Sequence, residues 1–332
     1  MNKIRKIKRI KIKKIKDLSI PEDFSLEKVG ITQSLMGMFI DCPRSFLLAI
    51  NKYYSDSANK NFSFGRIIHF VLDKIYSTGL KNEVKKFLSD YKKENKEKII
   101  GIDIETLQND INMAQIILTE YIKYYPEDFK NKKFIDVEKE GSCIINGFKI
   151  NYKIDGKFKD KKRKSIYLKE HKTKSKVVEN TICRILTFNF QNLIYLNCEE
   201  QSTNKKIDGT LFNIIRKPQI KRKISETEVE FYKRLKEDVK KRPEFYFIRY
   251  EIPYTEATKK ESIEELKEVL ENIKYKIEKC RKTGKNNMFY KNSKSCDSGF
   301  YTCTFLDACS SGVLTNYRQK DKLFSELKSI KY

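Results

Sequence analysis

Hydrophobic and polar positions alternate with a period of two in the middle of the chain. Within residues 148–158 this alternation predicts a half-buried strand, with Phe148, Ile150, Tyr152 and Ile154 of one parity and Lys149, Asn151, Lys153 and Asp155 of the other. Asn146-Gly147, immediately before it, is typical of a two-residue hairpin turn. The polar run Lys161-Lys162-Arg163-Lys164 predicts a second turn, into a strand that ends near Thr173. We therefore expect three consecutive antiparallel strands.

Helical periodicity surrounds this centre. It predicts helices at residues 32–51, 65–76, 181–200, 225–241 and 259–280, and a charged helical stretch that Pro126 ends at about Tyr125. Two further strands are predicted at residues 210–216 and 244–254. No internal repeat is evident. The order of elements predicts an α/β core with flanking helices before and after it.

The predicted strand that ends near Thr173 carries the clearest candidate chemistry. Glu170 and Lys172 share one face of that strand, because side chains alternate, while His171 points the other way. Asp155 comes one hairpin earlier. Two carboxylates on neighbouring strands supply hard oxygen ligands for Mg²⁺ or Mn²⁺, and a lysine beside them can orient an attacking water at a phosphodiester. In a chain with 35% charged residues such a triplet also arises by chance, so its surroundings matter.

Other motifs stand in a fixed order around this triplet. Gln191 and Tyr195 share one face of a predicted helix, and His69 lies in another helix, where a lone histidine by default only completes a local hydrogen bond. Taken together, the sequence resembles the RecB-like branch of the PD-(D/E)XK nuclease superfamily, which includes AddB-type nucleases, CRISPR-associated adaptation nucleases and phage exonucleases. The matching residues are Phe39, Cys42, Pro43 and Phe46, then Gly65 and His69, Asp155, Glu170, Lys172 and Thr173, Gln191 and Tyr195, and finally Cys296, Cys303 and Cys309.

This resemblance implies a restriction-endonuclease-like core with a central mixed sheet. It implies that His69, Asp155 and Glu170 bind the metal and that Lys172 acts on the water. It also implies that Gln191 and Tyr195 position DNA or the active-site helix. It covers residues from about Thr32 to Cys309, and it implies a cysteine cluster that joins the two ends of the domain.

The eight cysteines fall into two groups. Cys143, Cys183, Cys198 and Cys280 are scattered singly and are interpreted as ordinary packing residues. Cys296, Cys303 and Cys309 lie close together, with six and five residues between them, and Cys42 offers a fourth thiolate. Four thiolates suit a [4Fe-4S] cluster, with tetrahedral Zn²⁺ as the competing interpretation and three loop thiols plus a buried cysteine as the simplest one. The first interval is longer than the C-x-x-C usual in the resembling family, so the type of cluster stays open.

Composition indicates the partner and the compartment. The formal net charge is +25, from 70 basic and 45 acidic residues, and a polyanion is the simplest partner for such an excess. Residues 1–17 hold nine Lys or Arg and no long apolar run, so we expect a flexible basic arm and no signal peptide. No stretch approaches the roughly 20 apolar residues of a membrane span. A reducing, cytoplasmic setting in a bacterial or phage-infected cell follows, in which clustered cysteines favour metal.

Along the chain we expect five segments: a basic arm (1–17), an N-terminal helical part (18–130), the catalytic core (131–216), a helical and strand extension (217–290) and a cysteine-cluster segment (291–332). The predicted function is metal-dependent DNA cleavage, by an exonuclease of phage or recombination and repair type. DNA, as single strands or duplex ends, is the expected partner, together with a helicase or recombination protein. The alternatives are a CRISPR-associated type of nuclease acting on single strands and a non-catalytic nucleic-acid-binding module.

Overall fold

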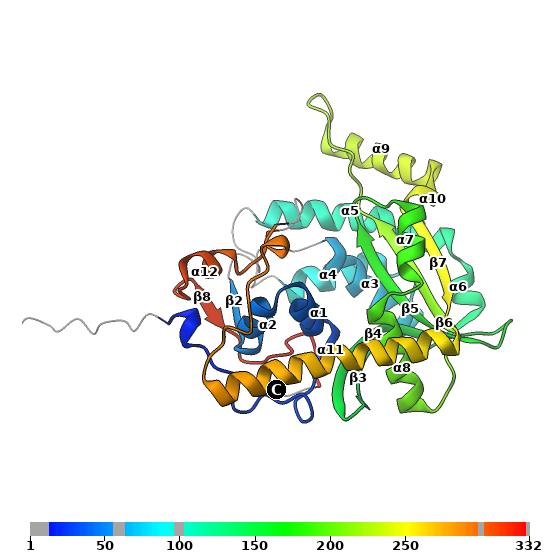
Figure 1. Ribbon diagram of the computed structural model, residues 1–332. Coiled ribbons are helices and arrows are strands. Elements are labelled where there is room, and N and C mark those ends of the chain that lie inside the picture. Colours follow the sequence, from blue (N-terminus) through cyan, green and yellow to red (C-terminus); the bar gives the residue numbers. More distant parts are fainter. Residues whose placement is uncertain (1–12, 56–63, 96–102, 298–301, 330–332) are drawn as a thin grey trace, which may run out of the picture. The chain divides into compact units, whose positions relative to one another are not determined.

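The computed structural model describes residues 13–55, 64–95, 103–297 and 302–329 (Figure 1). The chain divides into two compact units, which are described separately. The first comprises residues 1–60, 146–149 and 267–332, and the second comprises residues 61–145 and 150–266. Within the described residues, no helix is both long enough and apolar enough to cross a membrane.

A mixed sheet forms the centre of the second unit. β3 (Lys132–Ile145) pairs with β4 (Phe148–Asp160), and β4 runs antiparallel to β5 (Ile166–Lys174). β5 is parallel to β6 (Gly209–Arg216), and β6 is antiparallel to β7 (Phe247–Pro253). The parallel pair requires a long crossover connection, which two helices between β5 and β6 provide. The predicted mixed α/β architecture is therefore confirmed.

The predicted hairpin turn before β4 is also present. Asn146 and Gly147 have φ angles of 50° and 83°, and two consecutive positive φ angles are what a type I′ turn requires. The turn between β4 and β5 is likewise where the basic run predicts it, since Asp160 accepts hydrogen bonds from the backbone N–H groups of Lys162 and Arg163. Local turn chemistry thus sets the register of the strands that carry Asp155 and Glu170.

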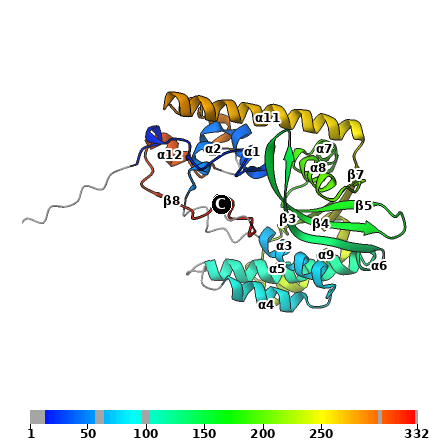
Figure 2. The ribbon, with the colours of Figure 1, turned by 90° about the horizontal axis from the view of Figure 1, so that it is seen from below.

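Helices cover both faces of this sheet. α3 (Phe64–Thr78), α4 (Val84–Glu94), α5 (Asp103–Tyr124) and the short α6 (Glu127–Lys130) precede the strands, and Figure 2 shows α3 and α5 on one face with α7 (Glu179–Leu186) and α8 (Phe190–Thr203) on the other. α9 (Glu228–Lys241), α10 (Pro243–Tyr246) and the first part of α11 (Glu256–Thr283) complete the unit. α3 is anchored by one fully buried apolar stripe: Ile67, Ile68, Val71, Leu72 and Ile75.

Several predicted helices prove to be interrupted. The helix expected over 32–51 is two helices, α1 (Gln33–Asp41) and α2 (Pro43–Ile50), because Cys42 precedes a proline and adopts an extended conformation. The helix expected over 181–200 is likewise α7 and α8, with Asn189 capping the second. The charged stretch is α4 and α5, and the strand expected from residue 244 begins only at Phe247, after α10.

The first unit holds α1, α2, the rest of α11, α12 (Leu306–Ser311), β1 (Ile31–Thr32) and the single-turn helices η1 (Ile15–Asp17) and η4 (Ser293–Ser295). β2 (Tyr53–Ser55) pairs antiparallel with β8 (Tyr317–Gln319). Ile15 is buried in a cluster with Leu48 and Phe305. Packing therefore begins before residue 17, the expected end of the basic arm, while residues 1–12 lie outside the described part.

The cysteines predicted to be ordinary packing residues include a bonded pair. Cys143 on β3 and Cys198 on α8 form a disulfide across 55 residues of sequence, so their prediction as separate thiols is wrong. The long separation explains the error, because only the folded sheet brings β3 against α8. Cys183 and Cys280 are free, the former half-buried and the latter buried.

Candidate active site

β5 presents Glu170 and Lys172 on the same face, toward α8. The Lys172 ammonium donates hydrogen bonds to Glu170 Oε1 at 2.5 Å and to Gln191 Oε1 at 3.2 Å. Glu170 is only 5% exposed, whereas the Lys172 side chain is 31% exposed, so a buried acid is paired with a lysine that reaches solvent. The strand alternation thus brings three of the residues named from the sequence into contact.

Asp155 and His69 meet beside this pair. His69 Nδ1 lies 3.6 Å from Asp155 Oδ1, and the backbone N–H of His171 donates to Asp155 Oδ2 at 2.7 Å. Burial by itself would raise the pKa of Asp155, but the hydrogen bond and charge of His69 outweigh it and lower that pKa to about 2. Burial opposes the charged form of His69 as well, yet the Asp155 carboxylate raises the pKa of that imidazole. The Asp155 carboxylate is therefore ionised and fixed in orientation.

Glu138 on β3 completes the cluster and was missed from the sequence. One ligand atom each from His69, Glu138 and Asp155 lie within 4.8 Å of one another. Glu138 pairs with Lys153, and burial raises the pKa of its carboxyl. Its φ of 50° lies in the left-handed region that most side chains avoid. The sequence signal is that acids recur with the period of a strand at Asp136, Glu138 and Glu140, but this alternation does not single out Glu138 among the three.

These carboxylates are crowded enough to favour a cation. Burial and the neighbouring Asp155 raise the pKa of Glu170 to about 7, although Lys172 acts in the opposite direction. Neighbouring carboxyl groups repel one another when they are all ionised, and a bound cation relieves that repulsion. Carboxylate oxygens with one imidazole suit a small divalent ion such as Mg²⁺ or Mn²⁺. The residues present therefore fit a metal site.

Tyr195 and His171 have packing partners at the edges of the site. Tyr195, one turn beyond Gln191 on α8, is 7% exposed, and its ring lies 5.9 Å from that of Tyr152. The ring of His171 faces away from Lys172, as the strand alternation predicts, and stacks on Tyr76 at 5.8 Å. It also meets the ring of His69 edge-on at 5.8 Å. His171 thus touches the site through its backbone and its ring edge.

Behind β5, a buried ionic network holds the strand in place. Asp128 accepts hydrogen bonds from Lys169 at 2.7 Å, from Tyr76 at 2.7 Å and from Arg249 at 2.6 and 2.9 Å. Burial would raise the pKa of Asp128, but Lys169 and Arg249 outweigh it and hold that pKa well below its usual range. Lys169 and Asp128 have fully buried side chains. One strand therefore carries the site on one face and its ionic anchor on the other.

The four cysteines named from the sequence line one pocket in the first unit. Cys42, Cys296, Cys303 and Cys309 border a cavity of about 260 Å³. The backbone N–H of Asn292 lies 3.4 Å from Cys42 Sγ, and burial raises the pKa of the Cys303 and Cys309 thiols. Amide donors around converging sulfurs are a common feature of metal–thiolate sites.

Comparison with known proteins agrees with this arrangement. A family model described as the PD-(D/E)XK nuclease superfamily matches residues 31–310, which include every residue of the site and all four converging cysteines. No curated protein matches the chain. The geometry around Glu170 and Lys172 and the extent of this match together show that the chain belongs to the PD-(D/E)XK nuclease superfamily.

Proposed function

We propose that the protein is a metal-dependent deoxyribonuclease that hydrolyses phosphodiester bonds as an exonuclease of the phage or recombination and repair type. One observation carries the proposal. The His69, Glu138 and Asp155 ligand atoms cluster within 4.8 Å, beside a lysine that Glu170 and Gln191 hold in place. Both parts of that arrangement are what hydrolysis of a phosphodiester requires.

His69, Asp155, Glu170 and Glu138 would hold Mg²⁺ or Mn²⁺. When bound, the ion supplies a water of lowered pKa and offsets negative charge at the phosphate. Lys172 positions the attacking water and stabilises charge that develops in the transition state, and its ammonium is directed by Glu170 and Gln191. Tyr195, packed on Tyr152, fixes the α8 helix that carries Gln191.

The charge of the chain supports a nucleic-acid substrate. A net charge of +25 attracts phosphates without reading sequence. DNA as the substrate and exonucleolytic action follow from the resemblance to RecB-like nucleases. A helicase or recombination protein is the partner that the same resemblance implies.

The decisive experiment compares two DNA substrates, linear and circular, with purified protein and Mg²⁺ or Mn²⁺. End-labelled linear DNA should be degraded progressively, and covalently closed circular DNA should remain intact. Nicking of the circle would contradict exonuclease action but not cleavage itself. Binding of all substrates without cleavage under any metal condition would instead indicate a nucleic-acid-binding module.

For the four cysteines we propose a [4Fe-4S] cluster that stabilises the first unit, with Zn²⁺ as the alternative. Their convergence on one cavity supports the proposal, and so do two cations beside the sulfurs, Arg44 and Lys291, which lower the cost of thiolates. Anaerobically purified protein should contain iron and acid-labile sulfide, and Cys303→Ala should lose both. Cys280→Ala, which changes a buried cysteine outside the cavity, is the control. Colourless protein with stoichiometric zinc would replace the iron–sulfur assignment, and metal-free protein of full stability would remove it.

A further inference from the structure

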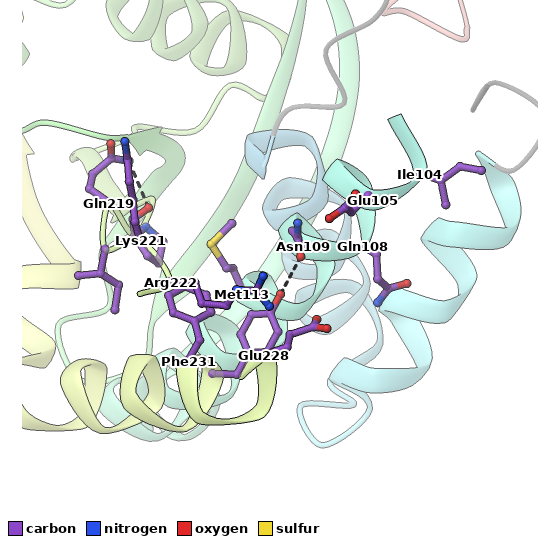
Figure 3. A pocket seen from close by; sticks show the side chains of 13 residues that line it. Ile104, Glu105, Gln108, Asn109, Met113, Gln219, Lys221, Arg222, Glu228 and Phe231 are labelled. Carbon is purple, nitrogen blue, oxygen red and sulfur yellow. Dashed lines mark hydrogen bonds between the residues drawn. The ribbon is translucent and has the colours of Figure 1, made fainter. Parts of the chain in front are cut away.

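A cleft of the second unit lies away from His69, Glu138 and Asp155, between α5, α9 and the segment that joins β6 to α9. It has a volume of about 850 Å³. Figure 3 shows residues of α5 such as Asn109 and Met113 on one side, Glu228 and Phe231 of α9 on another, and the segment around Lys221 and Arg222 closing a third. We propose that this cleft binds unpaired nucleotides of single-stranded DNA, with phosphates on the connecting segment and a base on Tyr232. The proposal rests on the proposed deoxyribonuclease function.

The connecting segment supplies the positive charge for the phosphates. Five of the eight residues from Arg216 to Lys223 are basic. The first two are neutralised, since Arg216 pairs with Glu179 at 3.3 Å and Lys217 with Asp110 at 2.8 Å. The other three are Lys221, Arg222 and Lys223, whose side chains are exposed. Within the described part of the chain, none of the three forms an ion pair with a carboxylate.

This basic wall is held in shape before any ligand arrives. Arg234 of α9 donates to both carboxylate oxygens of Glu226, at 2.7 and 2.6 Å, and to the carbonyl oxygen of Lys221 at 3.0 Å. A bidentate arginine pair fixes geometry as well as charge. The three free cations therefore project from an ordered segment, which reduces the entropy lost when they bind phosphates.

Tyr232 supplies a platform for a base. Its ring is half-buried, packs beside Phe231 with centroids 5.1 Å apart, and is fixed by a hydrogen bond from its hydroxyl to Asn109 Oδ1 at 3.0 Å. Aromatic rings bind bases by stacking whatever the sequence. The lining also contains two acids, Glu105 and Glu228, which would oppose a ligand that is anionic throughout. A nucleotide, with an anionic backbone and a neutral polar base, matches this division of charge.

The cleft is joined through the chain to the neighbourhood of β5, because Pro218, which lines the cleft, follows Lys217. The backbone N–H of Lys217 donates to the carbonyl of Lys174 at 2.9 Å, only two residues beyond Lys172. Lys217 also lies 5.5 Å over the ring of Phe64, where α3 begins before reaching His69. A single strand with a base in the cleft would therefore pass Lys217 on its way to the site. Bases in a duplex are stacked and cannot enter, so the cleft selects unpaired DNA.

Binding can be tested without cleavage. Fluorescence anisotropy in EDTA would compare a labelled dT 12-mer, an abasic 12-mer and a blunt hairpin duplex, all in the Glu170→Gln background. Tyr232→Ala should weaken dT binding about tenfold while leaving the abasic and duplex ligands unchanged. The triple change Lys221→Ala, Arg222→Ala and Lys223→Ala should weaken dT and abasic ligands alike. Removing the same charge from α9 instead, with Lys236→Ala, Lys240→Ala and Lys241→Ala, should have a smaller effect.

A second measurement guards against a folding artefact. Ultraviolet irradiation of protein bound to a 5-iodouracil oligonucleotide should cross-link the peptide containing Tyr232 in otherwise unchanged protein. Equal loss of dT and abasic binding in Tyr232→Ala, or cross-links confined to other peptides, would overturn the base site. Tighter binding of a U 12-mer than of dT would overturn the assignment to DNA.

The cleft proposal and the nuclease proposal can fail separately. If the protein cleaves DNA but Tyr232→Ala binds normally, only the cleft proposal fails. If the protein cleaves nothing yet Tyr232→Ala weakens dT binding, only the nuclease proposal fails.

Discussion

The carboxyl groups of the site, although close together, titrate very differently. Asp155 has a pKa of about 2 because His69 outweighs the effect of burial, whereas burial and Asp155 raise the pKa of Glu170 to about 7. A bound cation would counter the part of the second shift that Asp155 causes, since it offsets the charge that Asp155 and Glu170 place side by side. At the scale of single residues, the site is therefore a cluster of carboxylates that suits the dication we propose.

The first prediction separates catalysis from binding. Glu170→Gln and Lys172→Met should each lower the single-turnover cleavage rate by at least about 100-fold, because one removes a proposed metal ligand and the other the donor proposed to act in the transition state. DNA affinity in EDTA should stay unchanged. Lys174→Met is the matched control, since Lys174 is an exposed lysine two residues further along β5. Equal losses in Lys172→Met and Lys174→Met would show a general charge effect.

Glu138 leads to the second prediction. Glu138→Gln should weaken Mn²⁺ binding at least tenfold, as measured by electron paramagnetic resonance of free Mn²⁺, because a neutral amide oxygen is a poorer ligand for a hard dication. Glu140→Gln is the control, two residues further along the same strand. An unchanged Mn²⁺ affinity in Glu138→Gln would remove Glu138 from the ligand set and leave it as the partner of Lys153.

At the scale of elements, β5 is fixed by what lies behind it. Asp128 is surrounded by Lys169, Arg249 and Lys132, and removing its charge leaves buried cations without a partner. Asp128→Asn should therefore destabilise the protein by about 3–5 kcal/mol in urea unfolding. Glu264→Gln, which breaks an exposed pair with Lys260 on α11, should cost at most about 0.5 kcal/mol.

The same ionic network predicts a pH dependence of stability. Folding lowers the pKa of Asp128, so the stability that Asp128 contributes is fully present above its unfolded value of about 3.9 and is lost as the pH falls through the lower folded value. Asp128→Asn should therefore flatten the pH dependence of unfolding in this acid range. An Asp128→Asn protein with the acid sensitivity of the unchanged chain would show that other carboxylates dominate.

Sequence alone predicts the elements that depend on local pattern. The turn at residues 146–147 follows from its residue types. The face shared by Glu170 and Lys172 follows from a period of two residues, and the helix over residues 65–76 follows from a period of three to four. The break at Cys42-Pro43 was also readable, because a residue before proline avoids the helical region. Glu138, the Cys143–Cys198 disulfide and the partners of Asp128 were not predicted. Each depends on segments far apart in sequence. Glu138 depends in addition on its positive φ angle, which the alternation of polar and apolar residues does not reveal.

At the scale of the whole molecule, charge should dominate DNA affinity. If the protein makes about three to six phosphate contacts with single-stranded DNA, raising salt from 50 to 200 mM should weaken binding about 20- to 300-fold, with little dependence on sequence. Deleting residues 1–12 removes six Lys or Arg and should make the salt dependence shallower. The deletion stops before Ile15, which is buried, so the melting temperature should not change. Binding that is insensitive to salt would contradict a role for the charge excess.

Because of the backbone conformation at position 138, stability and activity should favour different residues there. Glycine adopts a φ of 50° without the steric penalty that a side chain meets there, so Glu138→Gly should raise stability by about 1 kcal/mol while removing a carboxylate from the metal cluster. A library of variants sorted only for heat resistance should therefore enrich glycine at position 138, whereas one sorted for DNA degradation should return glutamate. At position 138, the residue that the proposed metal site needs is therefore not the residue that the backbone conformation favours.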